Sequence, residues 1–489
     1  MKKYFLSVVT LVFVSIFSIA HGETVRILST NDMHSAIEKM PQIAAIVDSL
    51  RAIDPFLLVL SGGDNRTGNP YNDLYEPVSY PMVSMMNLIG FDASALGNHE
   101  YDSGVKGLAK VISLSNFPYL AANISCPPET GIQVVPYQIF NVKGIKVGVL
   151  GITQVGDGHI PDTHPDNVKG LTFQMPEEVI PQYKWLTEEC DVNVLLTHVG
   201  FEVDIELAKQ FPYYDLIVSA HTHTQLEGGE IHSGVLITQN GYQLPRVTLT
   251  SLEVENGKVV SKKAENIFLD KFTKRSEAAE ALLKHFKNSP EMERVVGQML
   301  SDIKGYDALG VMMTDAWAEE CNCDIALENY GGVRYDFFPA GPITVKDILN
   351  LDPFLNSPVV MNLSGKELHD MLIACFKADR NRFPITSGCT AVVTYTDSTK
   401  NAIKKLELFD ANGKKLNMKK KYRVVTNNYV ASIADSPRED QGVRGDVTTS
   451  DLITHWLEKK GTVDYQGRSR FTEMHSGCGH TPKRMPFIA

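Results

Sequence analysis

Five apolar runs in the first half of the chain each stop at side chains that commonly bind metals. The runs span residues 24–29, 56–60, 91–96, 192–196 and 216–218. Runs of this length, bounded by turn-forming residues, are typical of short buried strands. The polar residues that follow them are Asp32 with His34, Asp64, Asn98 with His99, His198, and His221 with His223. If these strand ends share one edge of a sheet, so many polar groups would be costly to bury without a common partner. The pattern therefore predicts a metal cluster.

Helical spacing appears between the strands. Ile43, Ile46, Val47 and Leu50 would form one apolar face of a helix, and a further strand is expected at 147–152. Strands interleaved with helices favour an α/β fold in which helices cover a mainly buried sheet.

The pattern changes after about residue 235. Alternating apolar residues flank an Asn256-Gly257 turn, which is typical of a hairpin. A helix with Ser276 as its predicted N-cap comes next. The second half then has its own strands and helices, including a helix that opens with a capping box at 364–367. We predict a targeting segment at 1–22, a first domain at 23–274, a linker helix at 275–294 and a smaller α/β domain at 295–489.

Composition argues against several classes of protein. With 43% hydrophobic and 21% charged residues, the chain has an ordinary globular composition and is not a disordered protein. Its formal net charge of -11 offers no basic surface for nucleic acid. Seven cysteines in 489 residues are too few for a disulfide scaffold. No pattern defines an oligomeric state.

The first 22 residues have the features of a secretory signal. Lys2 and Lys3 precede an apolar stretch at 5–19, and small residues follow near residue 20. The apolar stretch is shorter than the roughly 20 residues that span a membrane, and no later run reaches that length. We expect an exported protein, periplasmic or secreted, without a stable membrane anchor.

Nitrogen and oxygen ligands without a thiolate suit Zn²⁺, Mn²⁺ or Fe. Two such ions that share a carboxylate lie about 3.5 to 4 Å apart, polarise a phosphoryl oxygen and lower the pKa of a bridging water toward about 7. The residues therefore point to a dinuclear centre that hydrolyses a phosphate ester or a similar oxyanion.

The ordered motifs NDMH, GGD, GNHE, TH and HTH resemble those of the calcineurin-like metallophosphoesterase superfamily. In the second half, the segments at 324–334, 341–344 and 353–356 resemble the C-terminal domain of the 5′-nucleotidase/UDP-sugar hydrolase family. The resemblance covers nearly all of the chain after the signal. It implies a layered α/β/β/α domain, followed by a smaller α/β domain that presents the substrate.

The resemblance also implies a role for each residue of the strand ends. Asp32, His34, Asp64 and His223 would hold one metal ion, and Asp64 would bridge to a second ion held by Asn98, His198 and His221. His99 would contact the transferred phosphoryl group and Asp102 would orient it. A carboxylate in this place fixes the tautomer of the imidazole and supports its positive form beside developing negative charge.

The resemblance places the substrate pocket in the second domain. Arg334 of the Asn-Tyr-Gly-Gly-Val-Arg segment would approach the phosphate, which suits its planar guanidinium, and Asn329 of the same segment would be a further substrate-binding residue. Phe383 and Tyr429 match two aromatic residues that sandwich the base in nucleotidases, and Asp435 matches an acid of the same pocket. The implied activity is release of phosphate from nucleoside 5′-monophosphates by a metal-bridging hydroxide.

Three stretches depart from the family pattern. Residues 432–437 replace a Gly-Gly-Asp-Gly loop, residues 384–388 replace the usual Gln-Val-Ser-Gly, and Ala220 replaces a glycine. Because two of these stretches belong to the base pocket, UDP-sugars, cyclic nucleotides and sulfur esters of the thiosulfohydrolase type stay open as alternative substrates. A surface-binding protein without turnover is a further alternative, but it predicts missing metal ligands, and every ligand position here is filled.

Overall fold

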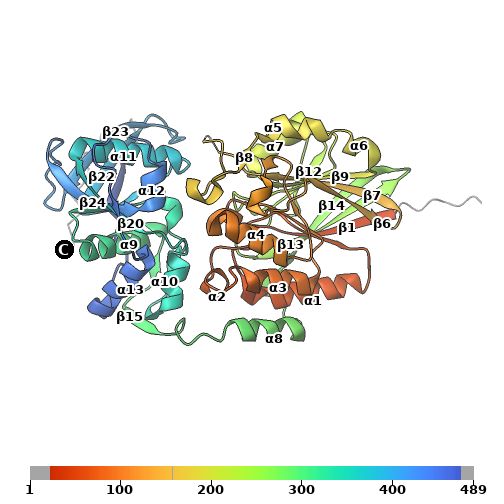
Figure 1. Ribbon diagram of the computed structural model, residues 1–489, viewed down its shortest axis with the longest axis horizontal. Coiled ribbons are helices and arrows are strands. Elements are labelled where there is room, and N and C mark those ends of the chain that lie inside the picture. Colours follow the sequence, from red (N-terminus) through yellow and green to blue (C-terminus); the bar gives the residue numbers. More distant parts are fainter. Residues whose placement is uncertain (1–22, 157, 475–489) are drawn as a thin grey trace, which may run out of the picture.

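The computed structural model of the protein describes residues 23–156 and 158–474. Two lobes lie side by side, with the first half of the chain in one and the second half in the other (Figure 1). The predicted targeting segment at 1–22 lies outside the described residues. Among the helices that are described, we find none with an apolar stretch long enough to cross a membrane.

Two six-stranded sheets form the first domain. One has the strand order β14-β13-β1-β2-β3-β4 and the other has the order β11-β12-β10-β9-β7-β6. The strands of the first sheet are β1 (Glu23–Thr30), β2 (Leu58–Ser61), β3 (Ala93–Ala95), β4 (Tyr119–Leu120), β13 (Arg246–Glu255) and β14 (Lys258–Phe268). Those of the second are β6 (Tyr137–Val142), β7 (Ile145–Thr153), β9 (Val192–His198), β10 (Leu216–Val218), β11 (Glu230–His232) and β12 (Val235–Thr238).

The sheets pack face to face because their strands alternate between two apolar surfaces. In β1, Val25 and Ile27 join the core between the sheets, whereas Leu28 points to the helices outside. In β2, Leu60 lies in the core between the sheets and Val59 lies on the outer side. This period of two is the geometry of a pleated strand buried on both faces.

Helices cover the outer face of each sheet (Figure 1). On the first sheet lie α1 (Met40–Arg51), α3 (Tyr80–Ile89) and α4 (Gly104–Leu114), and on the second lie α6 (Leu186–Glu189) and α7 (Phe201–Gln210). Two short helices, α2 (Pro70–Asp73) and α5 (Pro176–Val179), complete the domain, with a small pair of strands, β5 (Ile124–Ser125) and β8 (Thr172–Phe173). The predicted α/β/β/α layering is confirmed.

The middle strands of both sheets run parallel. β1, β2 and β3 are parallel neighbours in one sheet, and β7, β9 and β10 are parallel neighbours in the other. Their carboxyl ends therefore meet at one edge, which is where open α/β sheets bind ligands.

The predicted linker helix is α8 (Glu277–Phe286), which Ser276 precedes. It packs against α1 and α3, and Ala279, Leu283 and Phe286 lie in the core of the first domain. The helix thus packs on the surface of the first domain, and residues 287–294 continue from it to the second domain. The predicted hairpin at Asn256-Gly257 joins β13 and β14.

The second domain is built on the mixed sheet β21-β17-β24-β20-β25, with two three-stranded sheets in the orders β23-β22-β27 and β19-β15-β26, and a pair β16-β18. Its strands are β15 (Val295–Met299), β16 (Ile303–Lys304), β17 (Ile325–Glu328), β18 (Phe337–Phe338), β19 (Gly341–Thr344), β20 (Pro358–Ser364), β21 (Ile385–Ser387), β22 (Cys389–Tyr395), β23 (Ile403–Asp410), β24 (Lys421–Asn427), β25 (Val443–Arg444), β26 (Thr462–Val463) and β27 (Phe471–Met474). Its helices are α9 (Tyr306–Glu320), α10 (Val345–Leu351), α11 (Gly365–Ala378), α12 (Asn428–Ile433) and α13 (Thr449–Lys460). The predicted capping box is present at the start of α11.

Candidate active site

The polar residues at the strand ends come together at the shared edge of the two sheets. Their metal-binding atoms form three overlapping sets, in each of which all atoms lie within 4.8 Å of one another. The sets are Asp32, His34 and His223; His34, Asp64 and His99; and Asp64, His198 and His221. Asp64 and His34 each belong to two of these sets, so the three sets form one continuous cluster.

The distances within the cluster are short. His34 Nε2 lies 3.2 Å from His223 Nε2, and His198 Nε2 lies 3.1 Å from Asp64 Oδ2. His221 Nδ1 lies 3.0 Å from Asn98 Oδ1. Two imidazole nitrogens that face each other at this distance need a proton or a cation between them.

Two histidines of the cluster are held by hydrogen bonds from Nδ1, so that their Nε2 atoms face the cluster. His34 Nδ1 hydrogen-bonds the Thr67 carbonyl at 2.8 Å, and His198 Nδ1 hydrogen-bonds the Gly62 carbonyl at 2.8 Å. Both rings therefore present Nε2 to the cluster, where His198 Nε2 faces the Asp64 carboxylate. Metal-binding histidines are held by their second nitrogen in this way, so the residues fit divalent ions.

The two buried carboxylates also call for a cation. Burial raises the pKa of Asp32 to about 7, although His198 acts against it. Burial would raise the pKa of Asp64 as well, but the surrounding histidines, His198 first, hold it well below its ordinary value. A metal ion would favour the charged form of both carboxylates.

Five of the cluster residues have a left-handed backbone. Asp32 has φ 45°, His34 42°, Asp64 51°, His221 84° and His223 57°. Side chains other than glycine adopt this region rarely, although Asp and His do so more often than most. Such positions cluster at functional sites because the surrounding structure must hold them there.

His99 and Asp102 form a buried pair beside the cluster. His99 Nδ1 lies 2.7 Å from Asp102 Oδ2, and Thr67 Oγ1 donates to the same oxygen at 2.6 Å. Burial disfavours the charged imidazole, but Asp102 and Asp64 outweigh it and raise the pKa of His99. The geometry fixes the ring and supports its positive form.

Glu100 is a buried neighbour of the pair that the sequence interpretation did not single out. Its carboxylate accepts hydrogen bonds from the backbone N–H groups of Asp64 at 2.9 Å, Asn65 at 2.8 Å and Gly97 at 2.7 Å. It therefore joins the loops that follow β2 and β3. Its place in the GNHE motif was the signal that could have found it.

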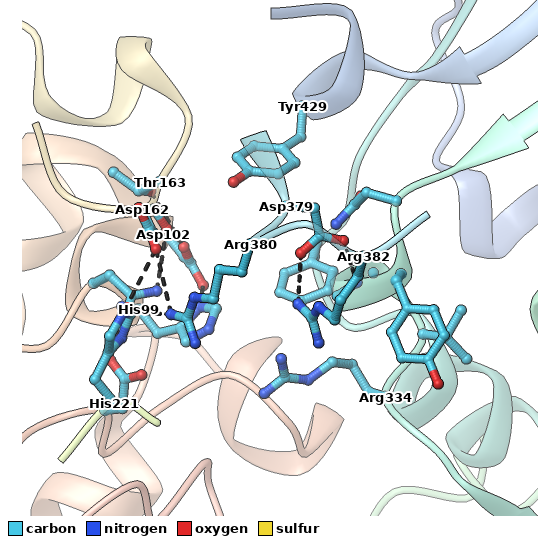
Figure 2. Close-up of a pocket in the computed structure, with 18 of the residues that line it drawn as sticks. His99, Asp102, Asp162, Thr163, His221, Arg334, Asp379, Arg380, Arg382 and Tyr429 are labelled. Carbon is cyan, nitrogen blue, oxygen red and sulfur yellow. Dashed lines mark hydrogen bonds and ion pairs between the residues drawn. The ribbon is translucent and has the colours of Figure 1, made fainter. Parts of the chain in front are cut away.

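A cavity of about 330 Å³ opens beside the cluster and has walls from both domains. Figure 2 shows Arg334 and Arg380 reaching from the second domain toward His99 and His221 of the first. Arg334 Nη2 lies 3.4 Å from His34 Nδ1, and Arg380 Nη2 contacts His221 Nε2. Two guanidinium groups from the second domain thus lie against the cluster, where they could pair with an anionic substrate.

Residues that sequence reasoning missed shape the rest of this cavity. Asp162 pairs with Arg380 at 3.4 Å, and its backbone carbonyl accepts from Asn98 Nδ2 at 3.1 Å. Phe354 stacks on His99 with ring centroids 5.8 Å apart, and Arg334 lies over the rings of Phe354 and Tyr242. Phe354 lies in the segment 353–356, which resembles the family pattern. Asp162, Tyr242 and Arg380 lie in no segment that matched a motif.

Two of the residues assigned to the substrate pocket do not join this cavity. Asn329, Arg334 and Tyr429 line it. Phe383 instead stacks on Phe471 at 5.2 Å and lines a separate cavity of about 330 Å³. Asp435 is an exposed residue just after α12.

In this structure Tyr429 and Phe383 line different cavities, and the expected sandwich of a base between them stays a prediction. Arg380 and Asn381 turn the backbone through φ 49° and 58° just before Phe383, which is buried in the second domain's core. Tyr429 shares the cavity with Tyr306, Tyr330 and Phe354.

Family models match both halves of the chain. A calcineurin-like phosphoesterase model matches residues 25–225, and a model of the 5′-nucleotidase C-terminal domain matches residues 293–437.

Two named proteins are similar to this chain over most of their length. A 5′-nucleotidase of Vibrio cholerae is 28% identical and covers 90% of this chain and 91% of its own. The protein UshA of Escherichia coli is 26% identical over 90% of this chain and 92% of its own.

Solved structures share the fold. A 5′-nucleotidase precursor from Thermus thermophilus is 25% identical, with a TM-score of 0.81, and the match covers 92% of this chain and 99% of that one. A sulfate thiohydrolase, SoxB, from the same organism has a TM-score of 0.74 at 17% identity, over 90% of this chain and 83% of that one. The second likeness concerns the fold alone.

Proposed function

We propose that this chain, which belongs to the 5′-nucleotidase family of two-domain metallophosphoesterases, releases phosphate from nucleoside 5′-monophosphates. One observation carries the proposal. A single cavity joins a cluster of buried metal-type ligands in the first domain to two arginines and several aromatic rings in the second. A nucleotide would use all three features: the metal-type ligands for hydrolysis at its phosphate, the arginines for its negative charge, and the aromatic rings for its base.

We propose two ion sites that share Asp64. Asp32, His34, Asp64 and His223 would hold one ion, and Asp64, Asn98, His198 and His221 would hold the other. Divalent ions in such a pair polarise the phosphoryl oxygen and supply a hydroxide nucleophile near neutral pH. The nitrogen and oxygen donor set suits Zn²⁺ or Mn²⁺.

His99 has the geometry of a group that stabilises the transferred phosphoryl. Its Nδ1 is held by Asp102, so Nε2 is free to face the cavity. An imidazolium fixed in this position would balance charge that develops on the phosphoryl oxygens. Asp102 orients the ring and does not need to touch the substrate.

The second domain would bind the rest of the substrate. Arg334 and Arg380 offer guanidinium groups to the phosphate, and Asn329 lines the same wall. Tyr429 and Tyr330 offer ring faces to the base. Because the two domains each supply essential groups, the cavity works only when they lie together as they do here.

We also propose the division into a first domain at 23–274, a linker helix at 275–294 and a second domain at 295–489. We also propose that the protein is exported. The basic residues Lys2 and Lys3 before an apolar stretch support this.

The proposal is tested by phosphate release from a substrate panel. Purified protein supplied with Mn²⁺ or Zn²⁺ should release phosphate from AMP, and a chelator should abolish the release until metal is restored. The panel includes UDP-glucose, a cyclic nucleotide and a thiosulfate ester, whose hydrolysis is followed by loss of the compound itself because none of them yields phosphate directly. Absence of phosphate release from every nucleotide in the panel would overturn the assignment.

Tyr429→Ala should weaken nucleotide binding more than catalysis. Loss of one stacked ring corresponds to about 1 to 3 kcal/mol, so we expect KM for AMP to rise about tenfold with little change in kcat. Phe383→Leu serves as the matched control, because Phe383 packs on Phe471 away from the cavity. Steady-state kinetics on both variants measures the two effects. A larger rise in KM from Phe383→Leu than from Tyr429→Ala would contradict this expectation and would support the predicted sandwich of the base between Phe383 and Tyr429.

A further inference from the structure

Two parallel strands of the second domain end side by side at the cavity. β17 and β24 are parallel neighbours, with Ile325 opposite Val424 and Ala326 opposite Val425. The same register brings Glu328, the last residue of β17, beside Asn427, the last residue of β24. Both side chains are 1% exposed. A carboxyl group therefore lies buried beneath the substrate pocket.

Glu328 is bound on one side to the helix that carries Tyr429. Asn427 Nδ2 donates to both carboxyl oxygens of Glu328, at 3.0 and 2.8 Å. The other end of the same amide caps helix α12, since Asn427 Oδ1 accepts from the Val430 N–H at 2.7 Å. The orientation of this amide, and with it the start of α12, depends on Glu328.

On its other side Glu328 is bound to the loop that leads to Arg334. Once the Asn329 amide is turned to the orientation that its neighbours favour, Nδ2 donates to Glu328 Oε1 at 2.7 Å and Oδ1 accepts from the Gly332 N–H at 3.1 Å. The loop lies so close that a Cβ on Gly332 would be 1.8 Å from Glu328 Oε1. A side chain at position 332 would therefore displace the Glu328 carboxyl group from its present position.

We propose that Glu328 is a positioning residue that holds the Tyr429 helix and the Arg334 loop at a fixed separation, and so sets the affinity of the pocket for its nucleotide. The inference rests on the proposed function. Glu328 does not itself line the cavity, so its effect passes through Asn427, Asn329 and Gly332.

The contacts require hydrogen-bond acceptors more than a charge. Burial, and then the nearby Asp352, raise the pKa of Glu328 well above its ordinary value. A neutral side chain of the same shape should therefore keep much of the network, because an amide oxygen also accepts hydrogen bonds. Truncation would leave the Asn427 and Asn329 amides buried without a partner, which is costly.

The first test compares Glu328→Ala with Glu328→Gln. The alanine variant should raise KM for AMP about tenfold while kcat and metal content change little, and the glutamine variant should stay near the unchanged protein. Asp315→Asn is the matched control. Asp315 is a carboxylate of the same domain that binds Tyr465 and Arg470, outside the catalytic cavity. It should lower thermal stability and leave KM unchanged. Equal KM effects from Glu328→Ala and Asp315→Asn would overturn the inference.

The second test uses the close approach of Gly332. Gly332→Ala alone should raise KM, because the new methyl group meets Glu328. In the Glu328→Ala background the methyl group has room, so the double variant should be no worse than Glu328→Ala. Additive effects would contradict the contact on which the inference depends.

A third measurement separates this inference from the proposed function. Amide hydrogen exchange of Gly332 and Val430 should accelerate in Glu328→Ala and stay slow in Asp315→Asn, whatever substrate the enzyme takes. Unchanged exchange at both amides would refute the positioning role. If no nucleotide in the panel releases phosphate, the proposed function is refuted, but the exchange rates still report whether Glu328 holds the two segments in place.

Discussion

Replacing Asp64 with alanine is expected to abolish phosphate release and to lower the metal content of the protein. Asp64 belongs to two of the three ligand sets and also accepts the His99 N–H at 2.9 Å. Its loss removes the carboxylate common to both proposed ions. We expect turnover to fall by more than about a thousandfold, which corresponds to about 4 kcal/mol of transition-state stabilisation.

Metal analysis and phosphate release measured on the same sample test this expectation. Asp54→Asn is the control, because Asp54 is a buried carboxylate of the same domain that pairs with Arg26 and Lys143 away from the site. That variant should lose stability and keep its metal ions. Two ions per chain and ordinary turnover in Asp64→Ala would contradict the proposed bridging role.

His99→Ala should separate chemistry from metal binding. The imidazole lies beside the cluster and is held by Asp102, so its removal should lower kcat by about 10² to 10⁴ while the metal content stays the same. Asn98→Ala should lower turnover and metal content together, because Asn98 Oδ1 lies at the ligand cluster, 3.0 Å from His221.

The two neighbouring variants control for each other, since both side chains follow β3 in the same buried loop. Metal titration and steady-state kinetics should give different profiles for them. If His99→Ala and Asn98→Ala lose metal to the same extent, the division of labour between the two residues is wrong.

The sequence predicted the first domain well because its signal is periodic. Apolar runs such as 56–60 and 216–218 correspond to β2 and β10, and the polar groups that follow them gather at one edge. Parallel strands force this gathering, since their carboxyl ends share an edge. The positions of the strand ends could therefore be predicted from the spacing of apolar and polar residues alone.

The second domain's contribution could not be read in the same way. Arg380 lies in a left-handed turn, and its contact with His221 exists only because two separately folded domains lie together. Asp162 lies in a loop without periodic apolar residues. Phe383 occupies the position expected from resemblance, but the turn before it and packing on Phe471 send the ring elsewhere. Tertiary packing decides all three.

The left-handed backbone of the ligand loops affects the stability of the folded chain and hence its resistance to proteolysis. Five residues in that conformation cost about 1 kcal/mol each, against a total unfolding free energy of about 5 to 15 kcal/mol for an ordinary domain. Ions that bind only the folded chain offset this cost by mass action. A chain that loses its ions opens more often and is exposed to proteases for longer. If the proposed ions bind here, we therefore expect metal supply to affect the abundance of the protein as well as its rate.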